Sequence, residues 1–248
     1  MWMLGLGSLA AAADPPAMRP SGYLIAMAPI SDPWATPRLA RLADRHDAVR
    51  AREFGEEAEP TDHRRSDRLY ARMVVIGERR LDRRPGTTAE AAELHVRVGY
   101  LLVHLGREDE AVAQWTEALD EAPDGVLAAE AVLGLAQVAF DAGDDAEAAR
   151  WLDRLRDDPS FGGYAAYLTA WTAYRSGNVS TAIDGAFGAA DRQTSPIGDA
   201  MRRDAVRFAA SADDGTVAAT IDRACAADAA CVDESVALVE QLRATAVR

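Results

Sequence analysis

The stretch AELHVRVGYLLVHLGREDEAVAQWTEALDEAPDG, residues 92–125, decides the fold class of this chain. It holds two helix-forming segments joined at Gly106, a residue that tolerates the left-handed conformation in which helices often end. Gly99 in the first segment and Ala111 in the second are small enough to let two helices approach closely. Trp115 is large and apolar and would fill the space toward the next pair of helices. We therefore predict that these residues form an antiparallel helical hairpin.

The same layout of two helices around a turn occurs three times. The predicted pairs are Ala89–Leu105 with Asp109–Glu121, Leu127–Asp141 with Asp144–Arg156, and Tyr164–Arg175 with Ser180–Arg192. Their turn glycines, Gly106, Gly143 and Gly177, lie 37 and then 34 positions apart. A two-helix unit with a period near 34 residues is typical of a helical solenoid. The sequence thus predicts an all-α fold, an α-α superhelix of stacked hairpins.

These units resemble the tetratricopeptide repeat. The residues at the family's offsets are Gly99, Gly106, Ala111, Trp115, Ala118 and Pro123 in the first unit, Ala136, Gly143 and Ala148 in the second, and Ala170, Gly177, Ala182 and Ala189 in the third. The second and third units depart from the pattern, with Leu152 and Ala186 in the place of the aromatic residue. The resemblance implies a non-catalytic protein that binds a protein or peptide on the concave face of the superhelix.

A narrower resemblance lies in the third unit. Residues 164–177 read YAAYLTAWTAYRSG and are followed by Ala182-Ile183. This is similar to repeats of exported tetratricopeptide proteins from δ-proteobacterial cell envelopes, including the adventurous-gliding-motility type. Residues 199–208 are similar to the repeat that follows there, although this chain lacks a long array. The resemblance implies a periplasmic scaffold of the cell envelope with envelope proteins as partners.

Four regions are expected along the chain. Residues 1–13 are apolar and end in small residues suited to cleavage, so we expect a signal peptide, although a preceding positive charge is missing. The alternative is an apolar segment that packs or frays. Residues 14–65 are proline-rich or charged and are expected to be irregular and partly helical. Residues 66–210 would hold the repeats and residues 211–248 the capping helices. Export predicts a periplasmic protein; the alternative is a cytoplasmic adaptor or regulator.

The two cysteines, Cys225 and Cys231, lie six positions apart. In one straight helix they would be about 9 Å apart, which is too far for a disulfide. A turn at residues 226–230 would bring them together. In an exported protein we expect them to be bridged; otherwise they are two buried, small apolar residues.

The charge of the chain limits its partners. The formal net charge is −13, and all 27 basic residues are arginine. Nucleic acids and anionic membrane surfaces are bound by clustered cations, and arginine is dense only at residues 38–84, where acidic residues are interleaved with it. Nucleic acids and anionic membrane surfaces are therefore not expected as partners, and a basic or neutral protein partner is compatible with the composition.

The concave face of a tetratricopeptide superhelix is lined by the first helix of each hairpin, and this frame gives a candidate partner-binding surface. Its predicted residues are Tyr100, His104, Gln137, Phe140, Tyr164, Tyr167, Trp171, Tyr174 and Arg175. Tyrosine and tryptophan dominate binding hot spots. The alternative is that these rings fill the core between repeats. If Trp171 binds a partner, Trp171→Ala should leave the helices intact and abolish binding.

Catalytic and metal-binding patterns are not evident, and no cofactor is expected. His95 and His104 share one predicted helix but have no evident third ligand. No glycine-rich phosphate loop occurs, and no nucleophile is paired with a base in the atypical first 85 residues. The sequence therefore favours a binding protein over an enzyme.

Overall fold

A computed structural model describes residues 60–83, 87–193, 197–226 and 228–246. All regular structure in these residues is α-helical. The helices are α2 (Pro60–Asp82), α3 (Thr88–His104), α4 (Glu108–Glu121), α5 (Val126–Asp141), α6 (Asp145–Asp153), α7 (Gly162–Arg175), α8 (Val179–Ala190), α9 (Ile197–Ala209), α10 (Asp214–Cys225) and α11 (Ala229–Ala246). The predicted signal peptide and residues 14–59 of the predicted irregular segment lie outside the described residues.

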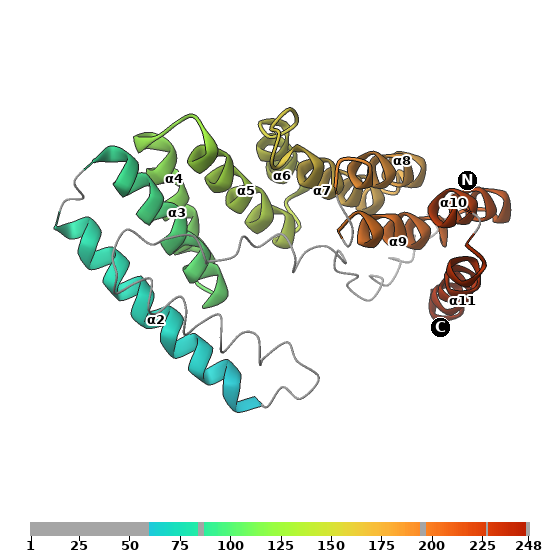
Figure 1. The fold of residues 1–248 in the computed structure, drawn as a ribbon, viewed down its shortest axis with the longest axis horizontal. Helices are drawn as coiled ribbons and strands as arrows, with labels where there is room; N and C mark the ends of the chain where they lie inside the picture. Colours follow the sequence, from blue (N-terminus) through green and yellow to red (C-terminus); the bar gives the residue numbers. More distant parts are fainter. Residues whose placement is uncertain (1–59, 84–86, 194–196, 227, 247–248) are drawn as a thin grey trace, which may run out of the picture.

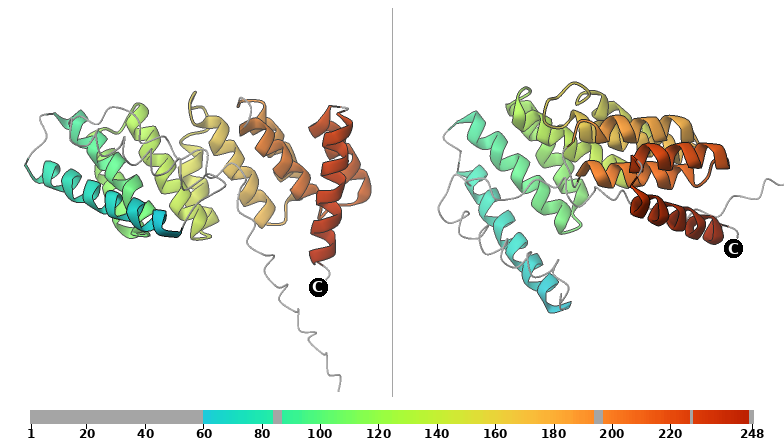
Figure 2. Two further views of the ribbon diagram at one scale, coloured as in Figure 1. Left: turned by 60° about the horizontal axis from the view of Figure 1, so that its bottom comes forward. Right: turned by 45° about the vertical axis from the view of Figure 1, so that its right-hand side comes forward.

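Eight of these helices form four hairpins that stack in chain order, as Figures 1 and 2 show. We call the first helix of each hairpin the A helix and the second the B helix. The A helices are α3, α5, α7 and α9, and the B helices are α4, α6, α8 and α10. At the two ends, α2 packs against α3, and α11 packs against α9 and α10. The fold is the predicted α-α superhelix.

The turn glycines end the first three A helices in the same way. Gly106, Gly143 and Gly177 have φ angles of 68°, 76° and 81°, the left-handed region that favours glycine. In each turn the glycine N–H and the next N–H donate back to the last carbonyls of the A helix, as when Gly106 donates to Val103 and Arg107 to Leu102. These bonds satisfy carbonyls that a helix end leaves unpaired.

Trp115 on α4 fills the seam between the first two hairpins. Its side chain is 1% exposed, and its indole N–H donates to the Val96 carbonyl at 3.1 Å. A Cβ atom placed on either Gly99 of α3 or Gly134 of α5 would lie 2.5 Å from the indole. The two glycines thus leave the room that the ring occupies, and Trp115 joins α3, α4 and α5 in one core.

Three boundaries differ by three or more positions from the sequence-based prediction. Helix α2 begins at Pro60, six positions before residue 66, where the repeat region is expected to begin. Proline is well suited to the first turn of a helix. Helix α6 ends at Asp153, three positions before the expected Arg156. The expected border at residue 210 falls inside the fourth hairpin, α9 and α10, so that only α11 caps the repeats. The side chain of Asp213 caps α10 by accepting from the Thr216 N–H.

A disulfide joins Cys225, the last residue of α10, to Cys231 in the first turns of α11. Ala226 follows Cys225 in the left-handed conformation, with φ 46° and ψ 41°, and ends α10. The chain therefore turns between the cysteines, and their Cα atoms lie 5.5 Å apart. The bridge ties the capping helix to the fourth hairpin.

Reduction of this disulfide is expected to lower the free energy of unfolding by about 2 kcal/mol, because the bond closes a short loop and restricts the unfolded chain. Urea denaturation with and without reductant measures the change. The matched control is the double variant Cys225→Ala/Cys231→Ala, which should be insensitive to reductant. Free thiols detected in the native, untreated protein would contradict the bridge.

Candidate partner-binding surface

The A helices form one wall of the stack, on the side of the molecule toward which α2 and α11 project (Figure 1). We call this side the inner wall. The residues that precede the turn glycines recur along it: His104, Asp141 and Arg175 each lie two positions before a turn glycine. Because successive hairpins repeat the same geometry, such equivalent residues line up from one A helix to the next.

The contact between the first and second hairpins involves Tyr100. Its hydroxyl donates to the Glu130 carbonyl of α5 at 2.8 Å, and its ring meets the Trp115 ring edge-on at 5.1 Å between centroids. Burial raises the pKa of Tyr100, and the negative charge of Glu130 raises it further, so the hydroxyl stays protonated. On the same helix the His104 ring stacks on Tyr70 of α2, with 4.8 Å between centroids. Both residues thus connect α3 to a neighbouring element.

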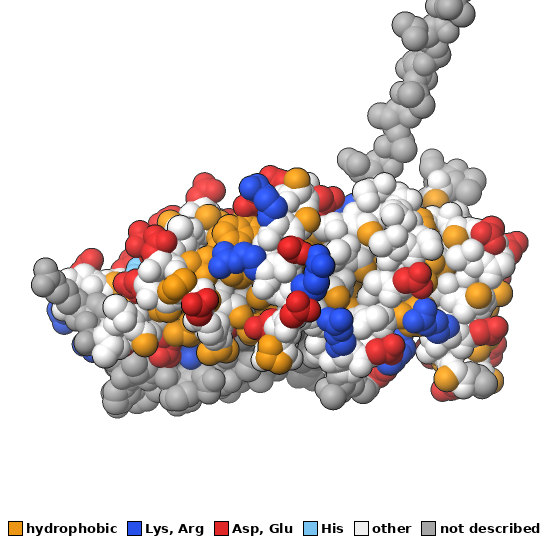
Figure 3. Space-filling view, turned by 90° about the horizontal axis from the view of Figure 1, so that it is seen from above, with side chains coloured by type: hydrophobic (Ala, Val, Ile, Leu, Met, Phe, Trp, Pro, Cys, Tyr) orange, Lys and Arg blue, Asp and Glu red, His pale blue; other side chains and the backbone are white. Residues whose placement is uncertain are grey.

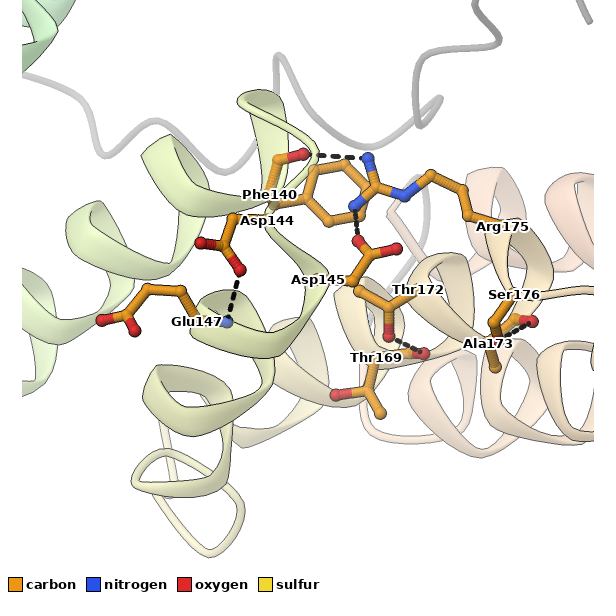
Figure 4. A network of polar contacts seen from close by, with 9 residues as sticks. All are labelled: Phe140, Asp144, Asp145, Glu147, Thr169, Thr172, Ala173, Arg175 and Ser176. Atoms are coloured by element: carbon orange, nitrogen blue, oxygen red, sulfur yellow. Dashed lines mark hydrogen bonds and ion pairs between the residues drawn. The ribbon is translucent and has the colours of Figure 1, made fainter. Parts of the chain in front are cut away.

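The contact between the second and third hairpins is made by two pairs. Gln137 of α5 donates to the Tyr164 hydroxyl of α7 at 3.4 Å, and both side chains are buried. Burial is also the main cause that raises the pKa of Tyr164. In the second pair, shown in Figure 4, the Arg175 guanidinium lies 3.7 Å from the Phe140 ring centroid and donates to the Phe140 carbonyl at 2.8 Å. Arg175 also forms an ion pair with Asp145 of α6.

The contact between the third and fourth hairpins is made by polar and aromatic side chains. The Tyr167 hydroxyl donates to Asp204 of α9, whose carboxylate is fully buried and also accepts from Arg207 at 2.9 Å. A buried carboxylate is tolerated because these donors compensate for the lost hydration.

Phe208 of α9 completes the same contact between hairpins. Its ring meets Trp171 edge-on at 4.8 Å and stacks on Tyr174 at 4.6 Å between centroids. Phe140, Tyr174 and Phe208 each accept a hydrogen bond, through their carbonyls, from the residue three positions later, so they are equivalent in their repeats. These equivalent aromatic residues of the A helices therefore pack at the contacts between successive hairpins.

The structure brings the nine predicted residues together along the inner wall but buries most of them. Gln137, Phe140, Tyr164, Tyr167 and Trp171 are buried, Tyr100, His104 and Tyr174 are half-buried, and Arg175 is exposed. Their contacts correspond to the alternative in which the rings fill the core between repeats. The Trp171 side chain is 2% exposed and packs on Phe208, so Trp171→Ala is instead expected to destabilise the fold.

The sequence-based selection missed charged side chains on the same wall. Asp141 is exposed, and the side chains of Arg97 and Arg207 are 18% and 31% exposed. Asp141 could have been found from its place in the repeat, which matches those of His104 and Arg175. The accessible part of the inner wall thus carries both signs of charge beside the edges of aromatic rings, an arrangement suited to polypeptide chains with mixed side chains.

His95 and His104 are held by neighbouring side chains on different elements. His95 Nδ1 lies 2.8 Å from Gln114 Oε1 and His95 Nε2 lies 4.0 Å from Glu121, both on α4, whereas His104 stacks on α2. Among the described residues, no group of three or more histidine, cysteine or acidic side chains could hold a metal ion. Nor does any helix in this part of the chain have the length and apolar character needed to cross a membrane.

Comparison with solved structures identifies the fold. No family model and no curated protein matches the sequence. Two similar structures are forms of a protein from Podosopora anserina, described as a "putative kinesin light chain" with nearly identical TPR-like repeats. One is 14% identical, with a TM-score of 0.50, over 84% of this chain and 96% of that one. The other is 13% identical, with a TM-score of 0.49, over 86% of this chain and 100% of that one. The first comparison shows that the fold is tetratricopeptide-like.

Proposed function

We propose that this chain is a non-catalytic scaffold that holds a polypeptide on its inner wall. The observation that carries the proposal is the continuous wall of four A helices, in which each helix is locked to the next by buried contacts. A tetratricopeptide-like fold suggests protein–protein interaction, since solenoids of this kind present extended concave binding surfaces. A wall fixed before binding loses little conformational entropy when a partner docks, and this favours affinity.

The partner is a polypeptide with a basic or neutral overall charge. The net charge of −13 attracts basic chains over long range and does not repel neutral ones. On the wall itself lie the exposed Asp141 and three arginines, Arg97, Arg175 and Arg207, that are paired with carboxylates of this chain. The edges of Tyr100 and Tyr174 offer apolar contact. The mixture favours recognition of particular side chains over attraction by charge alone.

The cell envelope is the proposed location. The apolar residues 1–13, the resemblance of residues 164–177 to repeats of exported envelope proteins, and the Cys225–Cys231 bridge all support export, because disulfides persist in oxidising compartments. The second candidate is a cytoplasmic adaptor. Sequencing the mature N-terminus from fractionated cells separates the two: an intact Met1 in the cytosolic fraction would contradict export.

A photo-crosslinking residue in place of Asp141 is expected to capture a protein partner in the native cell, because Asp141 is exposed on the inner wall. The matched control carries the same residue in place of Glu117, an exposed acidic residue of the B helix α4. Gel analysis and mass spectrometry measure the adducts. The proposal predicts a discrete adduct at position 141 that is absent at position 117. Equal capture at both positions, or a crosslink only within the chain itself, would contradict binding on the inner wall.

A further inference from the structure

A groove of about 700 Å³ opens between two successive B helices, α6 and α8, with α7 as its floor. Most of its lining residues are small, among them Ala149, Ala166 and Thr169. Helix α6 has only nine residues and therefore covers less of α7 than a longer B helix would. The corresponding groove between α8 and α10 measures about 390 Å³ and is lined by the ring of Phe187 and by Arg223 stacked on it.

The groove is basic although the chain is acidic. Arg150, Arg156 and Arg192 line it, and Asp153 is the one carboxylate among its lining residues. The side chains of Arg150 and Arg156 are 75% and 73% exposed, and each pairs with an acidic residue three positions earlier on its own segment. Such exposed pairs contribute little stability and can rearrange when another carboxylate arrives. Figure 3, which views the molecule from the B-helix side, shows arginine side chains over the middle of this face with acidic side chains between them.

The capping helix α11 presents the complementary surface. Asp233, Val236, Ala237 and Glu240 are all exposed, and their spacing places them on one face of the helix. Val236 is 42% exposed, one of three large apolar side chains that the described residues leave exposed. The helix's one arginine, Arg243, is directed to α10 and the turn before it, where it pairs with Asp214 at 2.6 Å and donates to two carbonyls. The outer face of α11 is thus acidic and carries the apolar side chains of Val236 and Ala237.

We infer that the groove between α6 and α8 binds the outer face of α11 from a second copy of this chain. In this contact the three groove arginines of one copy lie against Asp233 and Glu240 on α11 of the other copy. Val236 and Ala237 of that α11 pack on the small residues of the groove floor. Because the groove and α11 are different surfaces of one chain, the contact is head-to-tail, and each copy can bind one neighbour through each surface. This association uses surfaces other than the inner wall and does not depend on it.

Sedimentation velocity of the full chain over a range of concentrations tests the inference. The mass is expected to rise above the 26.6 kDa of one chain as concentration increases and to fall toward it in high salt, because salt screens the arginine–carboxylate pairs. Thr169→Trp, which fills the groove, and Val236→Lys, which places a cation on the outer face of α11, should each weaken association about tenfold or more.

Matched controls lie on surfaces outside the proposed contact. Thr116→Trp replaces an exposed threonine of α4 whose hydroxyl, like that of Thr169, donates to the carbonyl four residues earlier. Val75→Lys replaces a valine of α2 that is 42% exposed, as Val236 is. Both controls should associate as the unsubstituted chain does, and circular dichroism should show that all four variants are folded.

Mixing Thr169→Trp with Val236→Lys provides the sharpest test. Each variant keeps one intact half of a head-to-tail contact, so together they should form a one-to-one dimer that neither forms alone. A chain that stays monomeric at every concentration would overturn the inference and leave the groove to a partner of another sequence. Association that neither substitution weakens, or no dimer in the mixture, would overturn it as well.

Discussion

Trp115→Ala is expected to lower the free energy of unfolding by about 4 kcal/mol, within the range for large aromatic residues removed from a core. The side chain is 1% exposed and lies between Gly99 and Gly134. These glycines have no side chains that could move into the space, so the cavity stays open. Since α3, α4 and α5 all meet at this ring, we expect the first two hairpins of the variant to unfold at lower urea concentration than the rest. Separate unfolding is possible because each repeat of a solenoid contacts only its neighbours. Urea denaturation followed by circular dichroism and tryptophan fluorescence measures the loss.

The close approach of Gly134 to the ring supplies the control. Gly134→Ala places a Cβ atom 2.5 Å from the Trp115 indole, so it should cost about 1–3 kcal/mol in the unsubstituted chain. In the Trp115→Ala background the same change should cost almost nothing, because the space is empty. A double-mutant cycle reports this difference as a coupling free energy. Costs that simply add would show that Trp115 does not pack against α5.

Trp171→Ala is expected to cost about 3–5 kcal/mol of stability, because the ring is buried against Phe208 and Tyr174 at the contact between the third and fourth hairpins. Thermal and urea unfolding measure the loss. Partner binding is expected to fall only as far as the folded fraction falls. A variant with unchanged stability and abolished binding would contradict the core position and return Trp171 to the binding surface.

Phenylalanine at the same two positions separates packing from hydrogen bonding. The Trp115 N–H donates to Val96, whereas the buried Trp171 Nε1 has no partner among the described residues. Trp115→Phe therefore loses a hydrogen bond and Trp171→Phe does not. We expect Trp115→Phe to be more destabilising by about 1 kcal/mol. The reverse order would contradict the contacts described for the two rings.

The hairpins were predictable because their signals are local. Gly106, Gly143 and Gly177 are needed at positive φ, and the helices between them are long enough to be recognised by their periodic small and apolar residues. The fourth hairpin was harder to see. Its turn contains Ser211 and Ala212 in place of a glycine, and the α10 cap at Asp213 is a weaker signal in the sequence.

The role of the aromatic residues on the inner wall could not be decided from the sequence, since their spacing along a helix does not show which residues their rings contact. Tyr167 and Trp171 have the same helical spacing whether they contact α9 or a bound peptide. Their neighbours Asp204 and Phe208 come 37 positions later, a separation that only the stacking of hairpins closes. The groove between α6 and α8 was hidden for the same reason, because it depends on where α6 ends relative to α8.

The stacking of hairpins in chain order is the central claim, and nuclear Overhauser effects from the Trp115 indole test it most directly. In protein labelled at tryptophan and glycine, we predict cross-peaks from the indole protons to the Hα protons of both Gly99 and Gly134. The peaks to Gly99 report the first hairpin, and those to Gly134 report its contact with the second. Peaks to Gly99 alone, with none to Gly134, would show that the second hairpin does not stack on the first and would contradict the fold on which the proposed inner wall depends.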